Sequence, residues 1–248
     1  MVHNFKEGVS FGSLHSYRTW GLILESDSVS FPDVSTSIDN LPIYGIPGFD
    51  GKGTYGRRTL TFEFWKKNIG GKWPELIQQI TAAIHGRKLE IIRDCEPGHV
   101  YIGRCSVEAY EGVERVNAGR IKITVNAEPF TYSSEYITET YEQAGSVELN
   151  CSSKLETPAI VTITPRSSLV SVSISGLTGN QSMTINNLSI NTPVVIDGYK
   201  KTVKQGSTNK FHDCDLWQFP SLVPGRNIIT ITNGGYVNTE IKYREKMI

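Results

Sequence analysis

The chain has 248 residues, 38% of them hydrophobic, and its 25 lysines and arginines are balanced by 25 aspartates and glutamates. A chain of this length buries about 70% of its unfolded surface in one or two cores, which favours a self-contained globular protein. The balanced charge argues against binding to the phosphates of a nucleic acid. No long apolar run and no apolar leader occur, so we expect a protein that is made in a cytosol and does not span a membrane.

The N-terminal part is expected to begin with a strand. Over residues 16–24, the apolar positions Trp20, Leu22 and Leu24 alternate, which is the spacing of a strand that is buried on at least one face. A connection rich in proline and glycine follows at residues 31–56. We interpret it as a long irregular loop, and such a loop in a compact protein is usually functional or lies between subunits.

Part of this loop matches a nucleotide-binding motif letter for letter. Gly51-Lys-Gly53-Thr-Tyr-Gly56 has the spacing G-x-G-x-x-G, which binds a pyrophosphate where a strand precedes it and a helix follows it. Here Leu60, Phe62 and Phe64 alternate along residues 57–65, so a strand is predicted where the motif requires a helix. Nucleotide binding is therefore not expected.

One amphipathic helix is predicted over residues 73–84. Pro74 suits its first turn, Gly86 suits the position just after its end, and its apolar side chains form a single stripe. A single amphipathic helix among strands must pack on a sheet. Strands are predicted on its C-terminal side, at residues 88–92, 100–103 and 120–125.

The pattern becomes irregular over residues 131–158, and we place a domain boundary near residue 135. Beyond it, residues 170–174 and 182–186 alternate apolar with small polar side chains, which predicts two strands joined near Gly179-Asn180. A face of Ser, Thr and Asn can bind sugars, but an ordinary solvated sheet face has the same composition. Both interpretations stay open at this point.

The most informative stretch lies near the end of the chain. Residues 194–200 predict a strand, a hairpin turn at Asp197-Gly198 and a second strand. Pro224-Gly225 suits a type II turn, so a further strand is expected to begin at Asn227. Between them, four large apolar side chains are expected to fold over this sheet: Leu216, Trp217, Phe219 and Leu222. Together these features describe one end of a β-sandwich and contain no reactive group.

No catalytic or metal site is predicted. The four cysteines are spaced too widely for a zinc site: Cys95, Cys105, Cys151 and Cys214. His212-Asp-Cys214 contains residue types of a nucleophilic site, but on a strand Asp213 faces away from the other two. No nucleophile elbow, zinc-protease motif or P-loop occurs, so we expect neither an enzyme nor a cofactor.

Three segments in this order resemble the C-terminal signature of the distal tail proteins of long, flexible-tailed bacteriophages. They are Val195-Ile-Asp-Gly-Tyr-Lys200, Trp217-Gln-Phe-Pro-Ser-Leu222 and Val223-Pro-Gly-Arg-Asn-Ile-Ile-Thr-Ile231. Tyr44-Gly-Ile-Pro-Gly-Phe-Asp-Gly51 and Tyr55-Gly-Arg-Arg58 resemble the loop and strand of the same family's N-terminal domain. Eight residues of the C-terminal signature are expected to serve the fold: Asp197, Gly198, Trp217, Phe219, Leu222, Pro224, Gly225 and Asn227.

The resemblance extends over residues 12–243 and implies a mainly β protein of two domains. It implies a β-sheet domain with one helix over residues 1–135 and a galectin-like β-sandwich over residues 136–248. In this family the N-terminal domains form a hexameric ring that continues the tail tube, which implies a homo-hexamer at the virion tail tip, assembled in the cytoplasm of the bacterial host. The implied partners are the tail tube protein, the tape measure and the tail-associated hub protein. The outer domains of the family hold a receptor-binding protein or a host cell-wall sugar.

Ring contacts are expected from the loop at residues 31–56, whose apolar side chains need burial: Tyr44, Ile46, Phe49 and Tyr55. A free-standing, lectin-like carbohydrate-binding β-sandwich protein is the alternative, and a hydrolase is a more remote one. A lectin would bind sugar as a single chain, whereas a hydrolase would need a reactive group that we do not find in the sequence.

Overall fold

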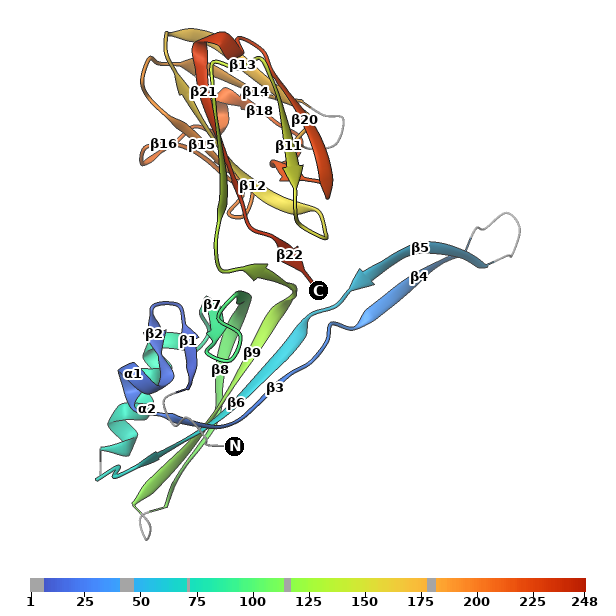
Figure 1. The fold of residues 1–248 in the computed structure, drawn as a ribbon. Coiled ribbons are helices and arrows are strands. Elements are labelled where there is room, and N and C mark those ends of the chain that lie inside the picture. The colour runs from blue at the N-terminus through green and yellow to red at the C-terminus, as the bar shows by residue number, and fades with distance from the viewer. Residues whose placement is uncertain (1–6, 41–46, 71, 114–116, 178–181) are drawn as a thin grey trace. The chain divides into compact units, whose positions relative to one another are not determined.

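The computed structural model describes residues 7–40, 47–70, 72–113, 117–177 and 182–248. The chain divides into two compact units, residues 1–132 with Ile248 and residues 133–247 (Figure 1). Both units consist mainly of antiparallel strands, as the alternating patterns and the resemblance led us to expect.

The first unit is built on one antiparallel sheet with the strand order β2-β1-β7-β8-β9-β6-β3. The central pairing joins β6 to β9, with Phe62 opposite Ile123 and Phe64 opposite Ile121, so these four buried side chains lie on one face. The strands are β1 (Val9–Phe11), β2 (Leu14–His15), β3 (Ile23–Val29), β6 (Arg58–Lys67), β7 (Lys88–Arg93), β8 (His99–Val113) and β9 (Ala118–Ser133). The strands predicted at residues 57–65, 88–92, 100–103 and 120–125 are confirmed, with the first beginning one residue later, at Arg58.

The predicted helix is confirmed as α2 (Trp73–Ile84). Its buried residues are Trp73, Ile77, Ile80 and Ile84, and they join the core of the sheet. Gly119 on β9 makes room for the first of them, because a Cβ there would lie 2.4 Å from Cε2 of Trp73. The helix packs on the sheet, as its single apolar stripe requires.

The strand predicted over residues 16–24 is wrong in its first half. Residues 16–20 form the short helix α1 (Ser16–Trp20), and β3 begins at Ile23. The side chain of His15 caps the first turn, and Gly21 ends the helix in the left-handed region with φ of 65°. The apolar alternation used for the prediction begins only at Trp20, the last residue of α1, so residues 16–19 are free to follow the two caps.

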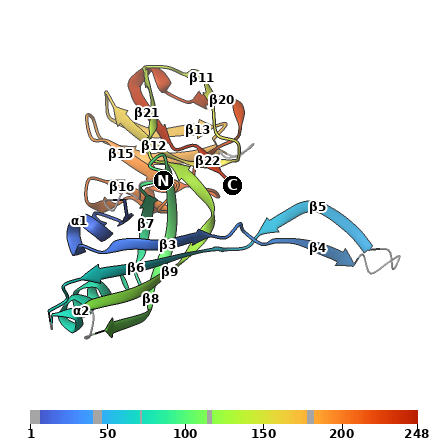
Figure 2. The same ribbon diagram turned by 60° about the horizontal axis from the view of Figure 1, so that its bottom comes forward.

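Two segments within residues 31–56 form an antiparallel ladder, so the prediction of an irregular loop is wrong for them. β4 (Val34–Asn40) pairs with β5 (Pro47–Tyr55), Val34 lying opposite Tyr55. The pair, which we name the arm, projects beyond the ends of β3 and β6 in both views (Figure 1 and Figure 2). Glycine supplies the backbone hydrogen bonds of a ladder like any residue, and Pro47 occupies the first strand position, where proline is tolerated.

The arm also contains the segment that matches the dinucleotide motif. Gly51 and Gly53 lie in β5, and β6 follows as a strand from Arg58. No helix N-terminus is therefore presented at this point to receive a pyrophosphate.

The second unit is a β-sandwich of two antiparallel sheets. One has the order β10-β21-β12-β15-β16-β17, with β19 also pairing β12, and the other has the order β11-β20-β13-β14-β18. Val161 on the first sheet and Val172 on the second belong to one buried cluster, which is the core between the sheets. The strands are β10 (Ile137–Glu142), β11 (Ser146–Cys151), β12 (Thr157–Pro165), β13 (Leu169–Ser175), β14 (Ser182–Leu188), β15 (Val194–Asp197), β16 (Thr202–Gln205), β17 (Thr208–Asn209), β18 (Cys214–Asp215), β19 (Ser221–Leu222), β20 (Gly225–Ile231) and β21 (Val237–Tyr243), with short 3-10 turns η2 (Phe211–Asp213) and η3 (Gly234–Tyr236). The last strand, β22 (Lys246–Met247), belongs to neither sheet of the sandwich.

Two predictions for this unit need correction. Residues 131–158 are not irregular, because they contain β10 and β11, and β11 buries Val147, Leu149 and Cys151 in strict alternation. The predicted strand at residues 170–174 exists as β13, but Val170 is 86% exposed. Across the ladder Asn187 takes φ of 56°, which breaks the alternation beside Val170.

Candidate functional site

The turn after β15 depends on Asp197. Its Oδ1 accepts hydrogen bonds from the backbone N–H groups of Tyr199 and Lys200, both at 2.9 Å. Asp197 is also the last paired residue of β15, opposite Thr202, so the connection to β16 has the four residues 198–201. The predicted turn is therefore present, but it is longer than the two-residue hairpin that Asp-Gly usually forms.

Gly198 is required for space. A Cβ at this position would lie 2.4 Å from the carbonyl oxygen of Pro220 and 2.6 Å from that of Ala159. The N–H of Gly198 donates to the same carbonyl of Ala159 at 2.9 Å. The backbone at Gly198 therefore lies so close to the backbone at Ala159 and Pro220 that a residue with a side chain would not fit.

The turn at Pro224-Gly225 is held by Asn227. Gly225 has φ of 82°, as a type II turn requires at this position. The Nδ2 of Asn227 donates to the carbonyls of Val223 and Gly225 at 2.9 Å, and its Oδ1 accepts from the N–H of Val223 at 3.0 Å. The strand β20 begins two residues earlier than predicted, at Gly225, and Ile229 is buried as expected.

The apolar run before this turn covers the sheet only in part. Leu222 is fully buried, and Leu216 and Phe219 are partly buried against the core. Trp217 is 84% exposed, so the expectation that its indole folds over the sheet is wrong. Between β18 and β19 no strand pairing imposes an alternation, and the two other side chains already cover the core edge.

The arm contains the four residues proposed for ring contacts. Tyr44 and Ile46 lie outside the described residues, and Phe49 lies in β5 opposite Ile38. Tyr55 is 39% exposed, and its ring meets that of Phe130 edge to face with centroids 5.5 Å apart.

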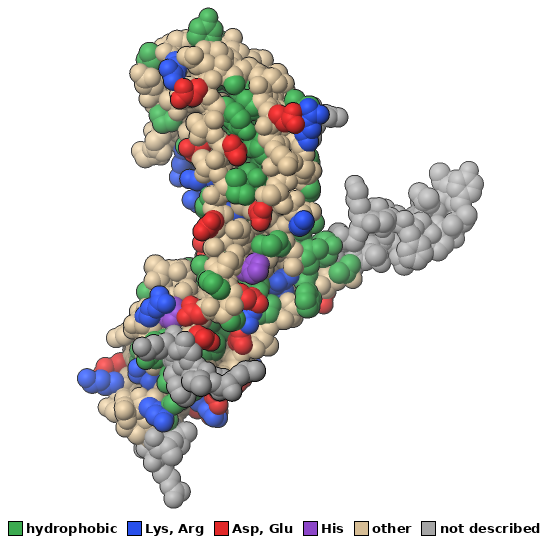
Figure 3. Space-filling view, in the orientation of Figure 1, with side chains coloured by type: hydrophobic (Ala, Val, Ile, Leu, Met, Phe, Trp, Pro, Cys, Tyr) green, Lys and Arg blue, Asp and Glu red, His purple; other side chains and the backbone are tan. Residues whose placement is uncertain are grey.

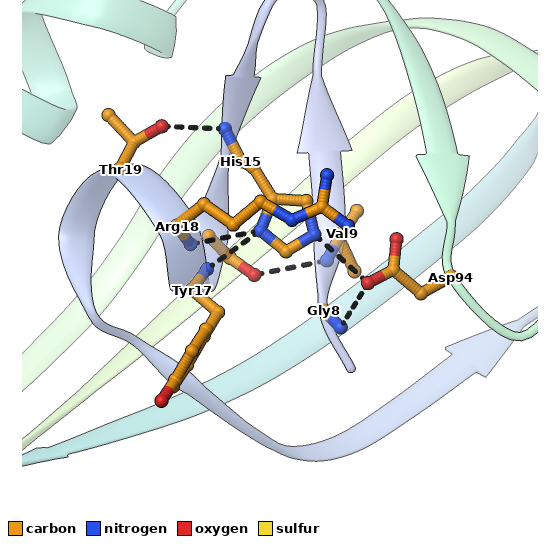
Figure 4. Close-up of polar contacts among 8 residues, drawn as sticks. Gly8, Val9, His15, Tyr17, Arg18, Thr19 and Asp94 are labelled. Carbon is orange, nitrogen blue, oxygen red and sulfur yellow. Dashed lines mark hydrogen bonds and ion pairs between the residues drawn. The ribbon is translucent and has the colours of Figure 1, made fainter. Parts of the chain in front are cut away.

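A polar cluster around His15 was not expected from the sequence (Figure 4). His15 is 6% exposed, and its Nδ1 accepts hydrogen bonds from the N–H groups of Tyr17 and Arg18 at 3.1 Å. Its Nε2 lies 3.0 Å from Oδ2 of Asp94, which also accepts from the N–H of Gly8 at 3.0 Å. Since Nδ1 is an acceptor, the proton lies on Nε2 and is donated to Asp94.

This cluster brings a histidine, a carboxylate and a serine together without forming a nucleophilic site. The Oγ of Ser16 accepts a hydrogen bond from the N–H of Val9 at 3.0 Å, and both nitrogens of His15 are already engaged. A general base needs a free basic nitrogen within reach of the nucleophile. The sequence pattern did not indicate this cluster, because a strand was predicted here and histidine is not one of the preferred capping residues.

The histidine and cysteine residues considered in the sequence analysis do not form a reactive site either. His212 lies in η2 and is exposed, while the carboxylate of Asp213 accepts from Nζ of Lys210 at 2.9 Å. Burial raises the pKa of Cys105 and of Cys214 to about 11, so both thiols are protonated and weakly nucleophilic at neutral pH. Within the described residues, no three His, Cys, Asp or Glu side chains are grouped to hold a metal ion, and no helix is long and apolar enough to cross a membrane.

Comparison with known proteins agrees with this architecture. Residues 152–247 match the family described as siphovirus-type tail component, C-terminal domain. No curated protein sequence matches the chain.

Two solved structures have the same fold over nearly the whole chain. The crystal structure of the SPP1 Dit protein, described as a hub adsorption apparatus in phages that infect Gram-positive bacteria, aligns with a TM-score of 0.64 and 13% identity, covering 98% of this chain and 99% of that chain. A chain of the phage P2 baseplate in its activated conformation with Ca aligns with a TM-score of 0.54 and 12% identity, covering 96% and 97%. Residues 152–247 are therefore similar to the C-terminal domain of siphovirus-type tail components, and over nearly its whole length the chain has the fold of the SPP1 Dit protein.

Proposed function

We propose that this tail component assembles as a closed ring of six copies at the tail tip, in which the arm of each copy contacts the next copy. The ring would join the tail tube protein and tape measure to the tail-associated hub protein, and its outer unit would hold a receptor-binding protein. The family implies a structural role without catalysis. The number six comes from the resemblance to the distal tail protein family, in which the N-terminal domains form a hexameric ring.

The observation that carries this proposal is the exposed apolar base of the arm. Phe31 and Val34 are 81% and 63% exposed, and Tyr55, which pairs with Val34 across the ladder, is 39% exposed. Large apolar side chains that cluster at the surface are typical of a contact site between proteins. We infer that a second copy covers them.

The backbone of the arm supports the same proposal. In the described part of the chain, β4 and β5 pair only with each other. A two-stranded ladder alone is marginally stable in water, and an unpaired edge is a template for another chain. A contact between the arm of one copy and a different surface of the next is heterologous, and such a contact generates a ring where the rotation closes.

Charge does not oppose this assembly. The formal net charge is zero, and Figure 3 shows acidic and basic side chains interspersed on the visible face. Long-range repulsion between copies is therefore weak, so contact between apolar groups can decide association.

Light scattering and electron microscopy test the ring. We expect the intact chain to form particles of six times 27.6 kDa, in a concentration-dependent manner or with its tail partners present. Residues 1–135 should also form rings, whereas residues 136–248 should not. The triple variant Phe31→Ser, Val34→Ser and Tyr55→Ser should shift the mass towards the monomer at a concentration where the native chain is a ring.

Tyr236→Ser is the matched control, since Tyr236 is 59% exposed on the second unit, and it should assemble as the native chain does. A triple variant that forms rings as readily as the native chain would remove the arm from the interface. A chain that stays monomeric at high concentration and with tail partners present would refute the ring and leave the lectin-like alternative.

A further inference from the structure

A hollow of about 550 Å³ lies on the second unit, beside the segment that links β18 to β19. Part of its lining comes from the segment Trp217–Leu222 of the C-terminal signature, and the lining combines aromatic rings with hydrogen-bonding groups of several kinds. The lining residues that matter here are Glu156, Lys201, Trp217, Gln218, Phe219 and Ser221.

Trp217 is the free aromatic surface of this hollow. Its side chain is 84% exposed, the highest exposure of any tryptophan or tyrosine among the large exposed hydrophobic residues that the structure describes. Phe219, by contrast, is already contacted by the ring of Phe211 at 6.3 Å between centroids and by Nζ of Lys201 at 5.3 Å. An indole left in water beside a hollow gains free energy when an apolar ligand surface covers it.

The polar groups are held in place around this ring. One carboxylate oxygen of Glu156 accepts a hydrogen bond from Oγ of Ser221 at 2.6 Å, and Nζ of Lys246 donates to the backbone carbonyl of Glu156 at 3.1 Å. Gln218 adds an amide that both donates and accepts. The lining of the hollow thus combines the carboxylate acceptor of Glu156 and the amide of Gln218 with the flat indole ring of Trp217.

We propose that this hollow binds one or two sugar units of a neutral oligosaccharide. A pyranose has an apolar face of C–H groups, which fits the indole of Trp217, and a rim of hydroxyls, which fits Glu156 and Gln218. The lining mixes the carboxylate of Glu156 with the ammonium groups of Lys201 and Lys246, so charge alone selects neither an anion nor a cation. A protein partner fits less well, because the centres of protein interfaces are depleted in charged residues, and this lining includes a glutamate and lysines.

The inference does not depend on ring formation and can fail separately from it. The intact chain is titrated by calorimetry with three probes, the β-1,4-linked tetrasaccharides of glucose, galactose and N-acetylglucosamine. We expect at least one of them to bind with a Kd of about 1 mM or tighter. Trp217→Ala should weaken that binding at least tenfold, and Gln218→Ala should weaken it by a smaller factor.

Val170→Ala is the matched control, because Val170 is 86% exposed in the same unit and does not line the hollow. It should bind the probe as the native chain does, and all three variants should unfold in urea at the native midpoint. Binding of none of the probes at millimolar concentration would overturn the proposal, and so would undiminished binding by Trp217→Ala. Loss of a tail-protein contact in Trp217→Ala, without sugar binding by the native chain, would assign the hollow to a protein partner and also overturn it.

Discussion

Two glycines of the C-terminal signature serve different physical needs. Gly225 is required for its backbone conformation, since φ of 82° is strained for other residues and a Cβ there would meet no atom within 4 Å. Gly198 is required for space, since its Cβ would collide with two carbonyl oxygens. The turn signal in the sequence predicted the positive φ of Gly225. The lack of space at Gly198 could not be predicted in this way, because it depends on the distant segments that contain Ala159 and Pro220.

We predict that Gly198→Ala destabilises the second unit by about 1–3 kcal/mol, because the backbone of two segments must move to accept the methyl group. Urea unfolding of the intact chain measures this change. Gly235→Ala is the control, since nothing lies within 4 Å of a Cβ there, and its free energy of unfolding should stay within about 0.5 kcal/mol of the native value. Equal stability of the two variants would show that the close approach at Gly198 relaxes without cost.

Among the elements, α1 shows how a short helix is stabilised by tertiary contacts. A helix of five residues is too short to be stable by itself. His15 caps it, and Asp94, the residue after β7, fixes the ring of His15, so the helix is tied to the sheet. A second hydrogen bond joins the helix to His15: the Oγ1 of Thr19 accepts from the N–H of His15 at 3.0 Å.

We predict an order of stability in which the native chain exceeds His15→Asn and His15→Asn exceeds His15→Ala. Asparagine is a good capping residue but is too short to reproduce the bond to Asp94, whereas alanine loses both, with a cost of about 1 kcal/mol for the cap alone. Thermal unfolding followed by circular dichroism gives the order. His212→Ala, at an exposed position, should leave the midpoint unchanged, and an alanine variant as stable as the asparagine variant would argue against a capping role.

At the scale of the whole molecule, each unit has its own core. The buried cluster of the first unit draws on residues between Val9 and Ala127, and that of the second draws on residues between Val147 and Tyr243. No residue belongs to both clusters. Separate cores of this kind are what independent folding requires.

We therefore predict that residues 136–248 fold alone as an all-β unit. The fragment keeps β10, which begins at Ile137, and Tyr136, whose ring lies under the guanidinium of Arg244 at 4.2 Å. Its far-ultraviolet circular dichroism should show β structure, and urea should unfold it in one cooperative transition. A coil-like spectrum at native pH would place the boundary elsewhere or make the second unit dependent on the first.

Local signals in the sequence were sufficient for α2, for β6, β7 and β20, and for the turn at Pro224-Gly225. Each of these rests on a periodicity or a dihedral preference that acts within a few residues, so neighbours in the chain contain all of the information. The balanced charge and the lack of a catalytic motif likewise followed from composition and spacing.

Other features were decided by contacts between residues far apart in the chain. His15 and Asp94, which stabilise α1, are 79 residues apart in the chain. The pairing of β4 with β5 was not predicted, because glycine and proline in this segment are more typical of a loop than of a strand. The exposure of Trp217 was decided in the same way, because Leu216 and Phe219 cover the edge of the core and leave the indole in solvent. A side chain's hydrophobicity predicts that it gains free energy by burial, but only the tertiary packing decides which of several neighbouring apolar groups is buried.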